Sequence, residues 1–136
     1  MTNELLWNYQ AKLHKITRFG PIVDGDTQQF MLDLGMYDYN VERVRLAGVD
    51  THETWGVSKD SEEFQKGKKQ TEWVEEWYAT GQEEWEGQWP FIVRSESYDP
   101  SDSFGRIIGR VIRRSDNEDL SEALIEEFGE ELIYEY

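Results

Sequence analysis

Cysteine is absent from this chain of 136 residues. Without a thiol, disulfides, zinc–thiolate centres and cysteine nucleophiles are excluded. Histidine is almost as scarce, because only His14 and His52 are present and they lie far apart in the sequence. A metal site that used histidine would therefore need carboxylates as further ligands.

Long apolar runs are also missing. No stretch approaches the roughly 20 apolar residues that a membrane helix needs. Residues 1–10 contain no basic region followed by an apolar run, so no secretory signal is visible. A secreted form whose signal peptide had been removed would also show none. We expect an intracellular protein, cytoplasmic or virus-encoded, with no membrane role.

Cationic side chains are few, with 14 Lys and Arg against 29 Asp and Glu and a net charge of −15. Nucleic-acid-binding proteins are normally basic, so the charge alone argues against that function. Two interpretations stay open. In a halophilic host, salt near 1 M would shorten the Debye length to about 3 Å, and high charge would favour solubility. The other is an ordinary acidic cytoplasmic protein.

The length and the alternation of apolar residues predict one domain over residues 1–136, and we expect a monomer. Short alternating runs bounded by turn residues indicate five strands. These strands are expected at residues 9–19, 27–34, 41–49, 90–96 and 104–113. In the third, Val44 and Leu46 point to one face and Arg43 and Arg45 to the other.

Two helices complete the expected pattern. The first spans residues 61–80, with Asp60 and Glu63 as a capping box and Gly81 as its stop. The second spans residues 120–128, begins after Asp119 and ends at Gly129. This order of elements fits an α+β fold, mainly β: a five-stranded Greek-key barrel of OB type with a helix after strand three and a C-terminal helix. Propensity alone does not select this fold over other α+β arrangements.

The segment Asp24-Gly25-Asp26-Thr27 places two carboxylates at a turn. Such a pair can hold a hard cation, or can form a plain hairpin turn. It also resembles the start of an EF-hand loop, but Gln29 stands where that loop needs glycine and Gly35 where it needs glutamate. That interpretation is therefore excluded.

Two further segments carry charged residues beside strands. Arg45 lies inside an apolar run that leads to Asp50 and Glu53. An arginine in a strand must be exposed or paired, so a solvated face with ion pairs is one explanation. Phe104-Gly105-Arg106 opens the fifth strand and is uninformative by itself.

Taken together in order and spacing, these segments resemble the staphylococcal nuclease (thermonuclease) family. The resemblance runs from about residue 12 to residue 129. It rests on Val23-Asp24-Gly25-Asp26-Thr27, Arg45-Leu46-x-Gly48-Val49-Asp50-Thr51-x-Glu53, Phe104-Gly105-Arg106, and Leu120-Ser121-Glu122-Ala123-Leu124-Ile125 before Gly129. It implies an OB-fold barrel with helices and a calcium-dependent hydrolase that cleaves phosphodiester bonds in DNA or RNA, usually the bond to the 5′ oxygen.

The resemblance also assigns a metal site. It implies that Asp26 and Asp50 supply carboxylates to Ca²⁺ and that the backbone carbonyl of Thr51 is a further ligand. Asp24 corresponds to a neighbouring acid that does not bind the ion directly. Calcium accepts an irregular shell of oxygens and water, which suits this set.

The catalytic roles follow from the same resemblance. Glu53 matches the residue that orients or deprotonates the attacking water, and Arg45 and Arg106 match the two arginines that grip the phosphate. Two positions differ from the family pattern. His52 replaces a proline before Glu53, which loosens that loop. Phe104 replaces a tyrosine, which keeps stacking on a base but loses the hydroxyl.

Other functions remain possible from the sequence. One is a non-catalytic OB-fold module that binds nucleic acid or protein, and another is an acidic interaction protein without a nucleic-acid role. The nuclease is favoured because all five positions that match the family's carboxylates and arginines hold the required residue type: Asp26, Arg45, Asp50, Glu53 and Arg106. Preference for DNA or RNA, and endonuclease or exonuclease action, stay open.

Overall fold

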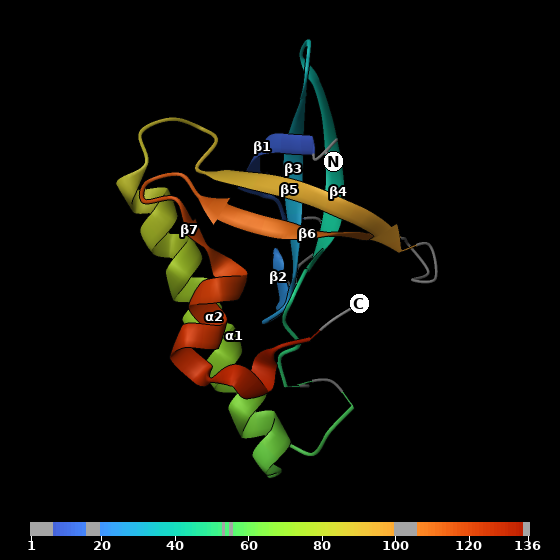
Figure 1. Cartoon of the computed structure of the whole chain (residues 1–136), viewed down its shortest axis with the longest axis vertical. Helices are drawn as coiled ribbons and strands as arrows, with labels where there is room; N and C mark the ends of the chain where they lie inside the picture. Colours follow the sequence, from blue (N-terminus) through green and yellow to red (C-terminus); the bar gives the residue numbers. More distant parts are fainter. Residues whose placement is uncertain (1–6, 16–19, 53, 55, 100–105, 135–136) are drawn as a thin grey trace.

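The computed structural model describes residues 7–15, 20–52, 54, 56–99 and 106–134. They form an α+β fold, mainly β, in which a closed barrel is flanked by two helices (Figure 1). The strands are β1 (Trp7–Leu13), β2 (Ile22–Asp24), β3 (Thr27–Gly35), β4 (Asp38–Leu46), β5 (Phe91–Asp99), β6 (Arg106–Arg113) and β7 (Glu118–Asp119). The helices are α1 (Glu62–Glu84), α2 (Leu120–Phe128) and the short 3-10 helix η1 (Glu130–Leu132).

Five of these strands close the barrel. β1 pairs with both β3 and β5, so the path β1-β3-β4-β6-β5 returns to β1. Only β4 and β6 run parallel within this ring; the other pairs are antiparallel. The predicted OB-type barrel is confirmed. β2, which pairs with β3, was not expected, and it makes α1 follow the fourth strand rather than the third.

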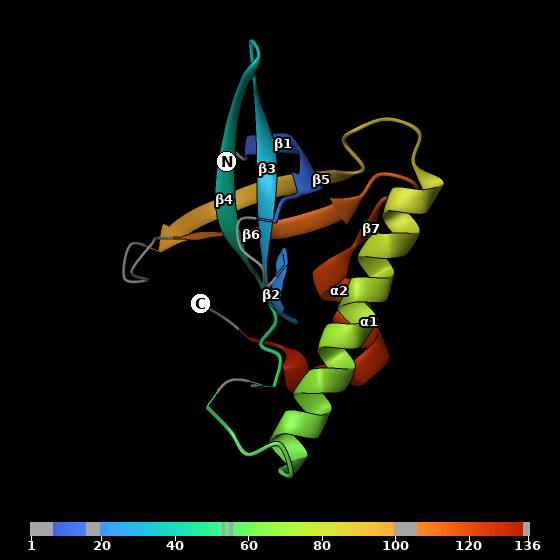
Figure 2. The same cartoon turned by 180° about the vertical axis from the view of Figure 1, so that it is seen from behind.

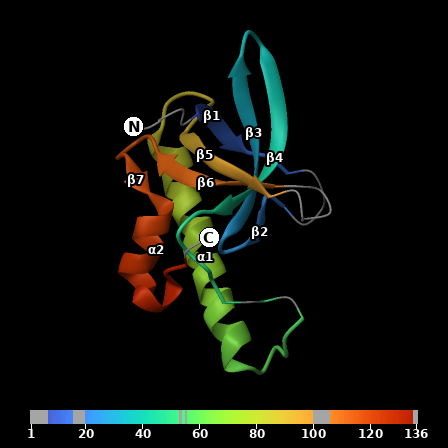
Figure 3. The same ribbon diagram turned by 45° about the vertical axis from the view of Figure 1, so that its right-hand side comes forward.

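The barrel interior is filled by the predicted apolar face. Val44 and Leu46 of β4 are completely buried. Aromatic rings close the end beside α1, where Tyr78 lies 4.9 Å from Phe91 and 5.9 Å from Phe30 between ring centroids. Figures 2 and 3 show α1 running along this end of the barrel. The helix thus completes a core that the strands alone would leave open.

α1 begins within one residue of its predicted start, but the predicted capping box and the predicted stop at Gly81 were wrong. The N-cap is Ser61, whose hydroxyl accepts a hydrogen bond from the backbone N–H of Phe64, so Asp60 and Glu63 form no capping box. The helix also continues through Gly81 to Glu84. A Cβ at residue 81 would lie 2.8 Å from side-chain atoms of Phe91 and Arg113. Glycine is therefore needed for close packing on the sheet and does not end the helix.

Strand boundaries differ from the prediction mainly at irregular points. β1 ends at Leu13 rather than at residue 19, and residues 16–19 lie outside the described part of the chain. β4 ends at Leu46, two residues before Gly48 takes a positive φ of 84°. The second helix agrees with its prediction, since the side chain of Asp119 accepts hydrogen bonds from Ser121 and Glu122 at its start.

The two main helices lie side by side against one flank of the barrel in all three views (Figures 1–3). Trp73 of α1 and Phe128 of α2 pack edge to face with ring centroids 5.9 Å apart. Trp77 is 4% exposed and stacks on Phe91, so its ring belongs to the core. In the ranges given above, neither helix combines the length and apolar character needed to cross a bilayer.

Candidate functional site

The turn between β2 and β3 brings two acidic residues to one end of the barrel. Asp24 accepts a hydrogen bond from the backbone N–H of Asp26 at 3.1 Å, which fixes the turn. Gly25 between them packs against Thr51, because a Cβ at residue 25 would lie only 2.9 Å from the Thr51 methyl carbon. The turn and the loop after β4 are therefore in direct contact.

Asp26 is the centre of this contact. It is 7% exposed, and its Oδ2 accepts hydrogen bonds from the backbone N–H of Thr51 at 2.9 Å and from the Thr51 hydroxyl at 3.1 Å. Its Oδ1 accepts a further bond from the hydroxyl of Thr27. Residues 25 positions apart in the sequence are thereby joined, and the Asp26 carboxylate has one fixed orientation.

Arg45 is buried rather than solvated, with 6% exposure. Its Nη1 donates to the backbone carbonyls of Leu46 at 3.0 Å and Val49 at 2.7 Å. Its Nη2 donates to Oδ1 of Asp50 at 3.1 Å and lies 3.6 Å from Oδ2 of Asp26. The guanidinium thus holds the loop that follows β4 and bridges both acidic side chains.

The two carboxylates have opposite pKa shifts. Burial alone would raise the pKa of Asp26, but its hydrogen bond with Asp24, the charge of Arg45 and the donors of Thr51 hold that pKa below its ordinary value of 3.8. Burial and the negative charge of Asp26 raise the pKa of Asp50 above 3.8, and Arg45 offsets only part of this effect. Two like charges therefore face each other, which is an arrangement that a bound cation stabilises.

Arg106 begins β6 and is partly buried. It precedes Ile107, the parallel partner of Val44, while Ile108 is the partner of Arg45. Because alternate residues of a strand share a face, Arg106 and Arg45 start on the same face of neighbouring strands, with Cα atoms about 8 Å apart. The fold therefore directs both arginines to one side of the barrel wall.

Two predicted site residues, Glu53 and Phe104, lie outside the described residues. The chain leading to Glu53 is nevertheless anchored, because the backbone N–H of His52 donates to the side chain of Gln70 on α1 at 2.8 Å. The ring of His52 lies 3.3 Å from Glu63 and 3.7 Å from Glu131. Gln70 was missed by sequence analysis, because nothing in a helical glutamine signals that it will cap a distant loop.

The donor chemistry of this end of the barrel suits a hard cation. Asp26 and Asp50 offer carboxylate oxygens, and more than half of the Asp50 side chain is exposed, at 54%. No group of three or more acidic, histidine or cysteine side chains with metal-binding geometry is present among the described residues, a set that leaves out Glu53. An ion held by these two carboxylates would need further oxygen ligands, and calcium accepts backbone carbonyls and water among them.

Comparison with known proteins assigns no family to the chain. No protein-family model matches the chain, and no curated protein matches its sequence. The site is therefore interpreted from its own geometry and chemistry.

Proposed function

We propose that this protein is a calcium-dependent nuclease of the staphylococcal nuclease type, which hydrolyses phosphodiester bonds of DNA or RNA. One observation supports this most directly. Asp26 of the β2–β3 turn, Arg45 of β4, and Asp50 and Thr51 of the loop after β4 meet in one hydrogen-bonded network at the end of an OB-type barrel. Asp24 borders the same network.

The metal ligands in this proposal are Asp26 and Asp50, with the backbone carbonyl of Thr51 as a third. Bound there, Ca²⁺ would neutralise charge that accumulates on the phosphoryl oxygens during attack. The residues themselves supply the preorganisation. Thr51 donates twice to Asp26 and fixes the carboxylate before any ion arrives, so little reorientation is needed at binding.

Arg45 and Arg106 would hold the phosphate from the same face of the barrel. A planar guanidinium contacts two phosphate oxygens at once, which an ammonium group does not. Arg45 uses one nitrogen for two backbone carbonyls and the other for the two carboxylates. Its backbone contacts would keep the side chain in place while its Nη2 turns to the substrate.

Glu53 would orient and deprotonate the attacking water. It follows Thr51 by two residues, and its loop is tied at Thr51 to Asp26 and at His52 to Gln70. A carboxylate is a suitable base for a water aligned with the leaving oxygen. The hydrogen bonds of the loop thus take over part of the stiffening that a proline at position 52 would provide.

The test is cleavage of plasmid DNA and of a single-stranded RNA by pure protein, with calcium or with a chelator. Glu53→Gln is expected to lower turnover by about a hundredfold or more while substrate binding persists. Arg106→Lys should be severely impaired, because a point charge cannot replace a two-pronged contact. The exposed Asp60→Asn variant serves as control. Calcium-independent cleavage, or full activity of Glu53→Gln, would overturn these assignments.

A non-catalytic OB-fold module is the second candidate. The observation that favours it is that protein groups already engage the Arg45 guanidinium at four acceptor atoms. The same experiment separates the two functions. A binding module would retain oligonucleotides or a protein partner in calcium without cutting either nucleic acid, and Glu53→Gln would leave that binding unchanged.

A further inference from the structure

One edge of β4 is only partly covered by neighbouring strands. β3 pairs with β4 from Asp38 to Arg45, but β6 pairs with it only from Val44 to Leu46. Residues 38–42 therefore have no partner strand on the β6 side among the described strands. An edge of this kind presents backbone groups to which another chain can add.

The orientation of the edge amides follows from two hydrogen bonds. The N–H of Leu46 donates toward β3, to Asp26, and the N–H of Ala47 donates toward β6, to Gly109. Backbone groups alternate along a strand. Tyr39 and Val41 therefore direct their N–H and C=O groups to the β6 side, where no described strand meets them.

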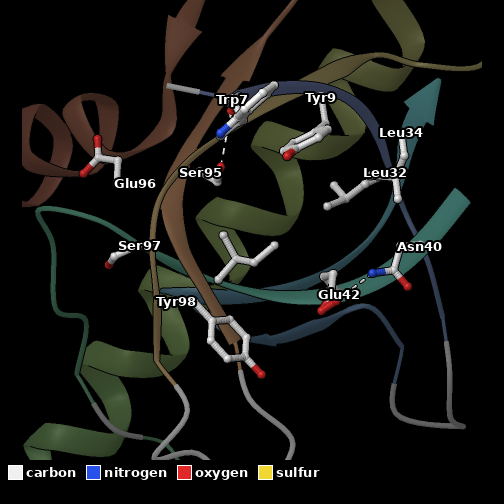
Figure 4. Close-up of a pocket in the computed structure, with 11 residues that line it drawn as sticks. Trp7, Tyr9, Leu32, Leu34, Asn40, Glu42, Ser95, Glu96, Ser97 and Tyr98 are labelled. Atoms are coloured by element: carbon white, nitrogen blue, oxygen red, sulfur yellow. Dashed lines mark hydrogen bonds between the residues drawn. The ribbon is translucent and has the colours of Figure 1, made fainter. Parts of the chain in front are cut away.

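A groove of about 540 Å³ lies beside this edge. β4 contributes Asn40 and Glu42, and Figure 4 shows these side chains facing the space that Trp7, Tyr9 and Tyr98 border. Trp7 and Tyr98 are largely exposed, at 60% and 58%. The groove therefore offers aromatic faces next to a strand edge.

The charge of the groove is negative. Its charged lining residues are Glu42 and Glu96, and no Lys, Arg or His is among the described residues that line it. Glu96 is paired with Arg110 at 3.2 Å, whereas Glu42 has no cationic partner among the described residues and accepts a hydrogen bond from the amide of Asn40 at 3.1 Å. With a net charge of −15 on the chain, a phosphate would be repelled here, while a cation would gain both the carboxylate and the aromatic faces.

We propose that this groove and the adjoining edge of β4 bind an extended basic peptide. The peptide adds a strand to β4 through the backbone groups of Tyr39 and Val41, and it places a Lys or Arg side chain on Glu42 in the groove that Trp7 and Tyr98 border. Main-chain hydrogen bonds provide the affinity of such strand addition, and a pocket for alternate side chains provides the specificity. The site is separate from the Asp26–Arg45 network and does not depend on the proposed nuclease function.

The geometry of the β4 edge sets the length of the peptide and the spacing of its cationic side chains. An added strand lies about 4.8 Å from β4, and every second side chain of that strand points to the groove. Residues 38–42 offer an edge about 16 Å long at roughly 3.3 Å per residue. The matching ligand is a segment of five or six residues with cationic side chains at alternate positions.

The experiment is calorimetric titration with a capped octapeptide of alternating Lys and Val. A peptide of alternating Glu and Val and a thymidine octanucleotide are the comparison ligands. We expect the Lys peptide to bind and the other two not to bind. Glu42→Gln and Trp7→Ala should each weaken binding by roughly tenfold, while Glu72→Gln, the same charge change on an exposed helix position, should change it less than twofold.

Strand addition itself is tested by amide exchange. Bound Lys peptide should slow exchange at Tyr39 and Val41 but not at Glu72, a readout that requires no variant and so no assumption about its folding. Equal loss of binding in Glu42→Gln and Glu72→Gln would show diffuse charge attraction and overturn the site. Binding of the oligonucleotide instead, or a concentration-dependent dimer that excludes the peptide, would assign the edge to another partner and also overturn the proposal.

Discussion

The Nη2 atom of Arg45 lies 3.1 Å from Oδ1 of Asp50. The same nitrogen is 3.6 Å from Oδ2 of Asp26. One internal cation thus stands between two carboxylates that would otherwise repel each other. Because Arg45 compensates only part of this repulsion, the pKa of Asp50 is raised by burial and by Asp26.

The first prediction concerns Asp50→Asn. A raised pKa means that the ionised carboxylate is disfavoured in the folded state at neutral pH, and asparagine can still accept from Arg45. In chelator at pH 7, the variant should melt slightly higher than the wild type, by roughly 1–3 °C. Calcium should raise the melting temperature of the wild type and not that of the variant. Equal calcium stabilisation of both proteins would remove Asp50 from the metal site.

A second prediction concerns the buried pair between α1 and β3. The hydroxyl of Tyr78 donates to the side-chain carbonyl of Gln28 at 2.7 Å, and both residues are almost completely buried. Tyr78→Phe leaves that carbonyl without its donor and should cost about 1–3 kcal/mol at pH 7, as measured by urea denaturation. A loss below about 0.5 kcal/mol would mean that water replaces the hydroxyl.

The same pair predicts an alkaline pH dependence. Burial raises the pKa of Tyr78 well above 10.0. The unfolded chain ionises near pH 10 while the folded chain does not, so the stabilisation is complete below that pH and is lost as the pH rises through the folded-state pKa. The wild type should therefore lose stability above about pH 10 more steeply than Tyr78→Phe. Parallel curves for the two proteins would contradict this.

The tip of the β3–β4 hairpin yields a third prediction. Met36 and Tyr37 both have positive φ, at 56° and 62°, and their side chains are 98% and 92% exposed. A two-residue turn of this type prefers Asn-Gly. The double variant Met36→Asn, Tyr37→Gly should raise the free energy of unfolding by about 1–2 kcal/mol. Met36→Ala, which keeps the strained backbone, is the control and should change little.

The fourth prediction concerns salt, and it rests on the proposed nuclease function. With a net charge of −15, the long-range field repels a nucleic acid, and added salt screens that repulsion first. Screening also reduces repulsion among the acidic side chains of the folded chain. At saturating calcium, the initial rate on one DNA should rise past about 0.5 M salt before falling, and the melting temperature should rise over the same range. A rate that falls from the lowest salt, at constant melting temperature, would show that local basic contacts dominate.

Local patterns were sufficient for much of the fold. Alternation placed Val44 and Leu46 inside the barrel, and capping chemistry placed Asp119 at the start of α2. Both signals act within a few residues, so they can be read without knowing the rest of the chain. β2 escaped prediction because three residues are too few to show alternation.

The tertiary structure alone decided the features that depend on distant partners. Gly81 looks like a helix stop in the sequence, yet it allows α1 to approach Phe91 and Arg113. Arg45 looks like a solvated strand residue, yet the loop after β4 encloses it. The resemblance to the staphylococcal nuclease family implied that Asp26, Arg45 and Asp50 belong together. Their contacts, and the edge of β4 beside the Glu42 groove that no described strand covers, arise only when the barrel closes. Closure of the barrel determines which charged side chains are buried together in a low-dielectric environment. It also determines which backbone groups of a strand have no neighbouring strand to pair with. No local segment of the sequence contains either piece of information.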